Sequence, residues 1–145
     1  MGDITTIQMD EEERNEFLMT GGTGVISFSA GTEESPYTLP VSYGYDATST
    51  RFYFRLASGP NSKKEEVIDR PISFVTYDKT EEGWCSVGVT GRLKEVAEAD
   101  IDSDIVQGIR HVDIPIVDVF DRHPREVSFR FFHLDPDQLT SRKEP

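Results

Sequence analysis

Apolar and polar residues alternate with a period of two in several short stretches of this chain. The clearest stretch covers residues 36–45, and its apolar members are Tyr37, Leu39, Val41, Tyr43 and Tyr45. Such alternation predicts a strand with one buried face. Residues 51–56 repeat the pattern after a turn at 46–50, so the two stretches predict a β-hairpin. Pro40 has no N–H to donate, which indicates a bulge, an edge or a neighbour other than a strand.

Four further stretches predict strands, at residues 24–29, 72–77, 84–96 and 126–134. Gly91, near the middle of the longest one, indicates a bulge. Residues 10–20 predict a helix that Asp10 caps and Gly21 ends. Residues 58–69 and 98–108 also favour helices, and residues 114–121 fit either a helix or a strand. The pattern predicts a mainly β fold with short helices, either an antiparallel barrel or a sandwich.

A chain of 145 residues corresponds to about one domain, so we expect a single domain over 1–145 with an exposed tail at 136–145. No apolar run approaches the roughly 18 residues that a membrane-spanning helix needs. The N-terminal residues are acidic and polar, unlike a secretory signal. We therefore expect a cytoplasmic protein that does not associate with a membrane.

The chain is strongly acidic, with 27 acidic and 15 basic residues and a formal charge of −12. This balance argues against binding to nucleic acid, because phosphates would be repelled. An acidic chain that is poor in lysine is what we expect from a halophilic organism, since high salt screens repulsion between carboxylates.

Metal chemistry has little support in the sequence. Cys85 is the only cysteine and lies in an apolar stretch, where it is expected to be a small buried side chain. The histidines, which are His111, His123 and His133, have no i, i+4 pairing and no nearby cysteine. We therefore expect no metal site.

Residues 55–64 combine features that suit a phosphate ester. Arg55 ends a strand, small residues and a glycine follow it, and a helix begins near Ser62 and Lys63. Backbone N–H groups at a helix start and serine hydroxyls donate hydrogen bonds to phosphate, and the cations neutralise its charge. From the spacing alone, an equally good interpretation is that the lysines pair with Glu65 and Glu66.

The order of several motifs resembles the pyridoxamine 5′-phosphate oxidase-like flavin-binding split-barrel family, which includes small nitroimidazole-resistance-type reductases. The motifs are GGTGVISFS, PYTLPVSYGYD, FYFRLASGPNSK and WCSVGVTGR, together with Pro71 eight residues after Lys63. The resemblance extends from the first predicted helix to the last predicted strand. It implies a six-stranded antiparallel split β-barrel that binds flavin mononucleotide (FMN).

The resemblance also implies which residues bind the cofactor. Backbone groups of Pro40, Val41 and Ser42 would lie beside the flavin ring. Arg55, Ser62 and Lys63 would bind the phosphate. Trp84 and Ser86 would reach the flavin from the facing side, and family members are homodimers with the cofactor at the subunit interface.

The function implied is that of an FMN-dependent oxidoreductase with a small-molecule substrate and an electron donor. The C-terminal motif that the true oxidases use for pyridoxamine is not recognisable, so the substrate remains open. Two alternatives also remain open, because a fold does not fix a function. They are a reductase that uses the deazaflavin F420 and a flavin- or ligand-binding module without turnover.

Overall fold

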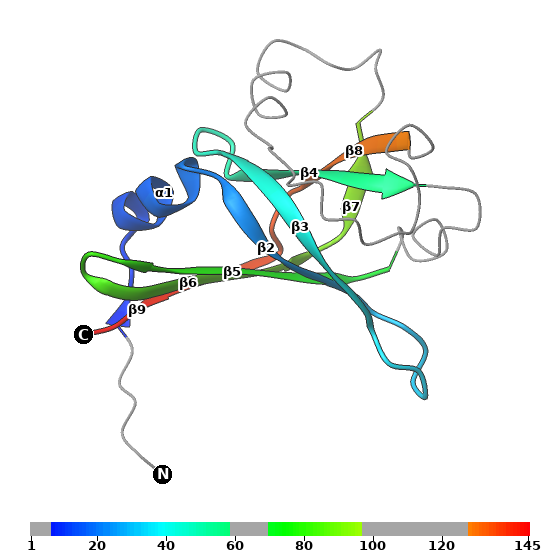
Figure 1. The fold of residues 1–145 in the computed structure, drawn as a ribbon, viewed down its shortest axis with the longest axis horizontal. Coiled ribbons are helices and arrows are strands. Elements are labelled where there is room, and N and C mark those ends of the chain that lie inside the picture. Colours follow the sequence, from blue (N-terminus) through cyan, green and yellow to red (C-terminus); the bar gives the residue numbers. More distant parts are fainter. Residues whose placement is uncertain (1–6, 59–69, 97–127) are drawn as a thin grey trace.

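The computed structural model describes residues 7–58, 70–96 and 128–145. These residues form one helix and a nine-stranded antiparallel sheet that curls on itself (Figure 1). The strands are ordered β1-β9-β6-β5-β2-β3-β4-β8-β7 across the sheet. In chain order the elements are β1 (Ile7–Gln8), α1 (Glu11–Met19), β2 (Gly22–Phe28), β3 (Tyr37–Asp46), β4 (Arg51–Ser58), β5 (Ile72–Thr80), β6 (Gly83–Gly91), β7 (Leu93–Glu95), β8 (Ser128–Leu134) and β9 (Gln138–Lys143).

The predicted mainly β, antiparallel split-barrel class is confirmed, although the sheet has nine strands where six were expected. Five of the predicted strands correspond to β2, β3, β4, β5 and β8. The sixth, at residues 84–96, is divided between β6 and β7, which pair with different parts of the sheet. The division follows Gly91, where an added Cβ would lie 2.7 Å from Cδ1 of Leu134. Gly91 thus allows close packing at the point where the chain leaves one side of the sheet for the other.

The expectation of an exposed tail over residues 136–145 is wrong for β9. This strand pairs with β6 on one side and with β1 on the other. Ser141 is only 4% exposed, and Leu139 packs against the core. The sequence QLTSRK has a single apolar residue, so its alternation is too weak to predict a strand. β9 is held in the sheet by pairing with strands that are distant in sequence. A local pattern of residues gives no information about such pairing.

The core fills the inside of the curled sheet with aromatic side chains. Phe74 lies at its centre, with its ring centroid 4.9 Å from that of Phe54 and 5.4 Å from that of Tyr43. Gly24 makes room for this ring, because an added Cβ would lie 2.7 Å from Phe74 Cε1 and 2.5 Å from the Val75 carbonyl oxygen. The apolar residues of the alternating stretches therefore point inward, as the sequence predicted.

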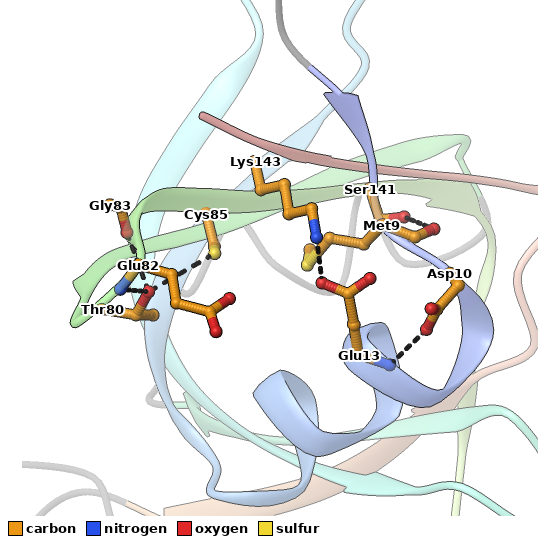
Figure 2. Close-up of polar contacts among 9 residues, drawn as sticks. All are labelled: Met9, Asp10, Glu13, Thr80, Glu82, Gly83, Cys85, Ser141 and Lys143. Carbon is orange, nitrogen blue, oxygen red and sulfur yellow. Dashed lines mark hydrogen bonds and ion pairs between the residues drawn. The ribbon is translucent and has the colours of Figure 1, made fainter. Parts of the chain in front are cut away.

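The predicted N-terminal helix is confirmed as α1. Asp10 caps it by accepting a hydrogen bond of 2.8 Å from the backbone N–H of Glu13. Among the residues of α1 only Leu18 is buried, so apolar packing holds it weakly. Polar contacts add to this: Glu13 pairs with Lys143 of β9, and Asn15 accepts a hydrogen bond of 2.7 Å from Tyr45 (Figure 2 shows the first of these).

The N-terminal segment and β9 are also joined by backbone contacts. The N–H of Met9 donates to the carbonyl of Ser141 over 3.3 Å, and the Ser141 hydroxyl donates to the carbonyl of Met9 (Figure 2). Close by, Cys85 lies on the inner face of β6, is 8% exposed and is 3.8 Å from Oγ1 of Thr80. Its burial confirms the structural interpretation of this cysteine.

The predicted helices at residues 58–69 and 98–108 and the ambiguous segment at 114–121 lie, apart from residue 58 in β4, outside the described residues. Within the described part of the chain, no helix has the length and apolar character needed to cross a membrane.

Candidate functional site

The face of the sheet that points away from the core, here called the outer face, carries most of the predicted cofactor contacts. Alternation along β3 places Pro40 and Ser42 on this face. The Val41 side chain points inward and belongs to the core. A ligand on the outer face can therefore reach only the backbone of Val41, and the expectation for this residue concerned its backbone.

Ser42 and Arg55 lie on the outer face at the end of the β3–β4 ladder. The last pair of this ladder is Tyr43 with Phe54, and Ser42 and Arg55 are the next residue on each strand. Ser42 is 1% exposed, yet its Oγ has no hydrogen-bond partner among the described residues. A buried hydroxyl without a partner costs roughly 1–3 kcal/mol. A ligand that hydrogen-bonds to this hydroxyl would recover that cost, so the pair fits a polar or anionic ligand.

The backbone beside this pair is open on one side. β4 pairs with β3 only from Tyr43 to Asp46, so the described part of the chain gives residues 37–42 a partner strand, β2, on one side alone. Pro40 lies in this part and pairs with Val25 of β2, with no partner strand on its other side among the described residues. This position agrees with a proline at an edge, and whether something other than a strand is its neighbour stays a prediction.

Ser62 and Lys63, predicted to bind the phosphate with Arg55, lie outside the described residues. Their assignment stays a prediction. Arg55 is partly exposed and belongs to the strand that leads directly to that segment.

Trp84 and Ser86 lie on the outer face of β6, with Tyr77 of β5 beside them. The rings of Tyr77 and Trp84 are 6.2 Å apart, and these side chains are 61% and 49% exposed. Sequence reasoning missed Tyr77, although the alternation of residues 72–77 assigned it to the face opposite Phe74. Exposed aromatic pairs of this kind are typical of surfaces that a ligand or another protein covers.

The two groups of predicted contacts are well separated within one chain. Ser42 pairs with Thr23 of β2, and Ser86 pairs with Tyr77 of β5, while β2 and β5 pair with each other from Val25 and Val75 onward. Three strand spacings therefore separate Ser42 from Ser86, which is about 14 Å.

The outer face from β9 to Ser42 of β3 lies between two acidic residues, Asp46 at the end of β3 and Glu144 after β9. It carries no acidic side chain itself, and we call it the acid-free face. Its residues are Gln138, Thr140 and Arg142 of β9, Trp84, Ser86, Gly88 and Thr90 of β6, Ser73, Val75, Tyr77 and Lys79 of β5, Thr23, Val25 and Ser27 of β2, and Thr38, Pro40 and Ser42 of β3. In a chain with 27 acidic residues among 145, this is a local departure from the overall charge.

The other part of the outer face, on β4, β8 and β7, carries a group of charged side chains that sequence reasoning did not find. We call Arg51, Lys94, His133 and Asp135 the basic cluster. Arg51 donates to Asp135 from Nε over 2.8 Å, and His133 Nδ1 lies 3.9 Å from Asp135 Oδ2. Lys94 pairs with His133 in the β7–β8 ladder. These residues are far apart in sequence, so no local motif indicates the cluster.

The charges of the basic cluster shift its pKa values. Burial and the neighbouring charges of Arg51 and Lys94 lower the pKa of His133, and Asp135 only partly opposes them. Burial alone would raise the pKa of Asp135, but its hydrogen bond with Arg51 and the nearby positive charges lower it overall. The hydrogen bond with Asp135 likewise raises the pKa of Arg51. At neutral pH the cluster therefore holds a neutral imidazole between charged groups.

A hollow of about 380 Å³ opens at the ends of β2, β5 and β6. Hydroxyl side chains from Ser27, Ser73 and Thr90 line it, together with Arg92 and Asp137. None of the predicted cofactor contacts lines this hollow. The candidate site is therefore the surface around Ser42, Arg55 and Trp84 rather than this hollow.

A curled antiparallel sheet with a polar, partly open outer face defines a split-barrel protein, and comparison with solved structures agrees. The FAD-binding protein from Mycobacterium smegmatis has a TM-score of 0.66 at 18% identity, over 96% of this chain and 99% of that one. An FAD-binding protein from Mesorhizobium loti has a TM-score of 0.67 at 19% identity, over 97% and 98%. An FAD- and haem-binding protein from M. smegmatis has a TM-score of 0.65 at 11% identity, over 93% and 71%.

The family model described as pyridoxamine 5′-phosphate oxidase matches residues 10–143. The chain belongs to this family, and the resemblance seen in the sequence is confirmed. No curated protein matches the chain.

Proposed function

We propose that this protein binds FMN on the outer face of its sheet and is a flavin-dependent oxidoreductase. The observation that carries the proposal is the buried hydroxyl of Ser42, which has no hydrogen-bond partner among the described residues and lies with Arg55 at the end of the β3–β4 ladder. Arg55 is assigned to the phosphate, together with Ser62 and Lys63 of the segment that follows β4. The open backbone of Pro40, Val41 and Ser42 is assigned to the edge of the flavin ring. Membership of the family and the FAD-binding neighbours support a flavin as the ligand.

The protein's own residues bind and orient the cofactor. A bound flavin supplies redox chemistry that no side chain of this chain provides. Ser42 contributes a hydroxyl that is already desolvated, so little further desolvation opposes its hydrogen bond. Arg55 contributes a charge-assisted contact, and Trp84 offers an aromatic face that excludes water.

We propose that two copies of the chain form each site. For one flavin ring to contact both the Pro40–Ser42 backbone and Trp84, the groups must meet, yet about 14 Å separates them within one chain. A second copy can bring its Trp84 and Ser86 against the first copy's Ser42. This arrangement makes the acid-free face the dimer interface.

The charge of the chain supports a second copy as the occupant of that face. Two chains of formal charge −12 repel each other wherever their carboxylates approach. The acid-free face is a surface on which they can meet without burying a carboxylate. Its exposed apolar members, Val75, Tyr77 and Trp84, supply the kind of area that stabilises an interface.

The phosphate assignment can be tested with the single tryptophan of the chain, Trp84, as reporter. Binding of FMN beside Trp84 is expected to quench tryptophan fluorescence. The Arg55→Ala variant should weaken FMN about 10- to 150-fold, the equivalent of a lost charge-assisted contact of about 1.5–3 kcal/mol. It should weaken riboflavin, which has no phosphate, far less. Equal losses for both ligands would show that Arg55 does not bind the phosphate.

Mixing two variants tests whether two chains share the site. Arg55→Ala keeps Trp84 but binds FMN poorly, and Trp84→Ala keeps Arg55 but has no tryptophan. After subunit exchange, one site of each mixed dimer combines Arg55 of one chain with Trp84 of the other. The FMN concentration is chosen so that the tryptophan fluorescence of Arg55→Ala by itself is not quenched. At this concentration the mixture of the two variants should show quenching. A mixture that stays unquenched would place the whole site within one chain.

Turnover separates an oxidoreductase from a binding module. The FMN-loaded protein is expected to be reduced by a nicotinamide donor and reoxidised by a substrate under anaerobic stopped flow. Reduction only by reduced F420 would identify the deazaflavin-dependent alternative. A flavin that exchanges electrons with neither donor would make the protein a binding module.

A further inference from the structure

We propose that the basic cluster is a second anion-binding site, in which Lys94, His133 and Arg51 hold a phosphate or carboxylate group of the bound ligand. This inference rests on the proposed function for the identity of the ligand, whose first phosphate is assigned to Arg55. It adds that the protein also accepts a flavin with another anionic group beyond that phosphate, as FAD has and FMN lacks.

The ion pair between Arg51 and Asp135 does not by itself explain the cluster. That pair joins the start of β4 to the residue after β8, as a surface salt bridge often does. Lys94, however, is exposed and pairs with no carboxylate among the described residues. Nδ1 of His133 is buried and has no hydrogen-bond partner within the same described part of the chain. Lys94 therefore lies, without a carboxylate partner in this part of the chain, beside an imidazole whose Nδ1 faces Asp135 across 3.9 Å.

The charge balance of the cluster favours an anion. Arg51, Lys94 and His133 surround a single carboxylate, that of Asp135. Tyr53, the ladder partner of His133, interacts with Arg51. An added anion would offset the two positive charges that keep the imidazole neutral. Such a site stands out in a chain whose formal charge is −12.

The position of the cluster links it to the candidate cofactor site. Arg51 and Arg55 lie on the same face of β4, four residues apart, which is about 13 Å along a strand. Lys94 lies on the same face two strands away, through the pairing of Tyr53 with His133 and of His133 with Lys94. Tyr53 lies between Arg51 and Arg55 on this face and is 2% exposed, so a ligand that spans both places would meet the ends of these long side chains rather than the sheet surface between them.

Histidine NMR of the full chain tests the anion site without any flavin. The His133 signal, assigned by its loss in His133→Gln, is titrated with pH in the presence of inorganic phosphate or of citrate. The pKa of His133 should rise in whichever anion the cluster binds, which separates phosphate from carboxylate recognition. Lys94→Gln should abolish this rise, and Lys79→Gln, an exposed lysine on the acid-free face, should keep it. An equal rise in wild type and Lys94→Gln, or none with either anion, would overturn the proposal.

A second test compares the affinities of the protein for two flavins. Lys94→Gln should weaken FAD, which has a phosphate beyond that of FMN, about tenfold and leave FMN nearly unchanged. Equal effects on FAD and FMN would contradict a second site on the same ligand. If the wild-type protein binds neither flavin, the proposed cofactor is wrong, whereas the response of His133 to phosphate or citrate still decides whether the anion site exists.

Discussion

The two parts of the outer face differ in both charge and burial. On the acid-free face, Tyr77 and Trp84 are 61% and 49% exposed and no carboxylate is present. On the part formed by β4, β8 and β7, Tyr53 is 2% exposed and lies next to charged side chains of the basic cluster. The contrast indicates two kinds of partner for one sheet, because a face with exposed rings and no carboxylates suits a second protein chain, whereas paired charges around buried groups suit a small anion.

Tyr53 and Tyr77 provide the sharpest comparison, because they are the same residue type on the same face of the sheet. Tyr53→Ala should lower the free energy of unfolding by about 3–5 kcal/mol, since a buried ring is removed. Tyr77→Ala should change it by less than about 0.5 kcal/mol when the chain is monomeric. Both free energies of unfolding are measured by urea unfolding of variants that also carry Val75→Glu, because we expect Val75→Glu to keep the chain monomeric. Similar losses for the two variants would show that the two parts do not differ in burial.

A single carboxylate added to the acid-free face should break the interface. Val75 is 40% exposed at the centre of this face, and in the proposed dimer Val75→Glu would place two like charges against each other. We expect the dissociation constant to rise about 100-fold, or roughly 2.8 kcal/mol. Sedimentation velocity over a concentration series measures it. Thr48→Glu adds the same charge in an exposed turn and should leave the dimer unchanged.

The basic cluster should make stability depend on pH near neutrality. The pKa of His133 is lowered from its ordinary value of 6.5, mainly by burial and then by Arg51. The unfolded chain therefore binds the proton first, so the free energy of unfolding should fall as the pH drops below 6.5. His133→Gln should flatten the curve in this range in urea unfolding at several pH values. An unchanged slope in the variant would mean that another group titrates there.

The smallest expected effect concerns the exposed ion pair of the cluster. Asp135→Asn should cost about 0.2–1 kcal/mol at low salt and almost nothing in molar salt, because exposed pairs are weak and screened. The pKa of Asp135 is below 3.8, so its stabilising contribution is present above that pH and is lost as the pH falls through the folded value. Thermal unfolding at both salt concentrations checks this. A loss that persists in molar salt would indicate packing rather than charge.

Local pattern was enough to predict most of the fold. The alternation in β3 and β4 and the Asp10 cap of α1 each depend on residues close in sequence, and all three are present. β9 was missed because its stability comes from pairing with β6 and β1 rather than from its own apolar residues. The break after Gly91 also depends on a distant residue, since Leu134 occupies the space that a Cβ would need.

The candidate site was only partly predictable for the same reason. Ser42 and Arg55 could be named from motifs, but their adjacency requires the register between β3 and β4. Arg51, Lys94 and His133 come together only through the pairing of β4, β8 and β7, which is not visible in any local spacing. Tyr77 could have been found, because its alternation with Phe74 already assigned it to the outer face.

The pairing of β1 with β9 has a consequence for the order of assembly. β1 is an edge strand whose neighbour in the sheet is β9, and the contact between Met9 and Ser141 joins residues 132 positions apart. Contacts of such long sequence separation form late, because a large loop must close before they are gained. β1 can join only after β9 is in place, so amide exchange should be fastest in β1, slower in β9 and slowest in β2 and β5 at the centre of the sheet.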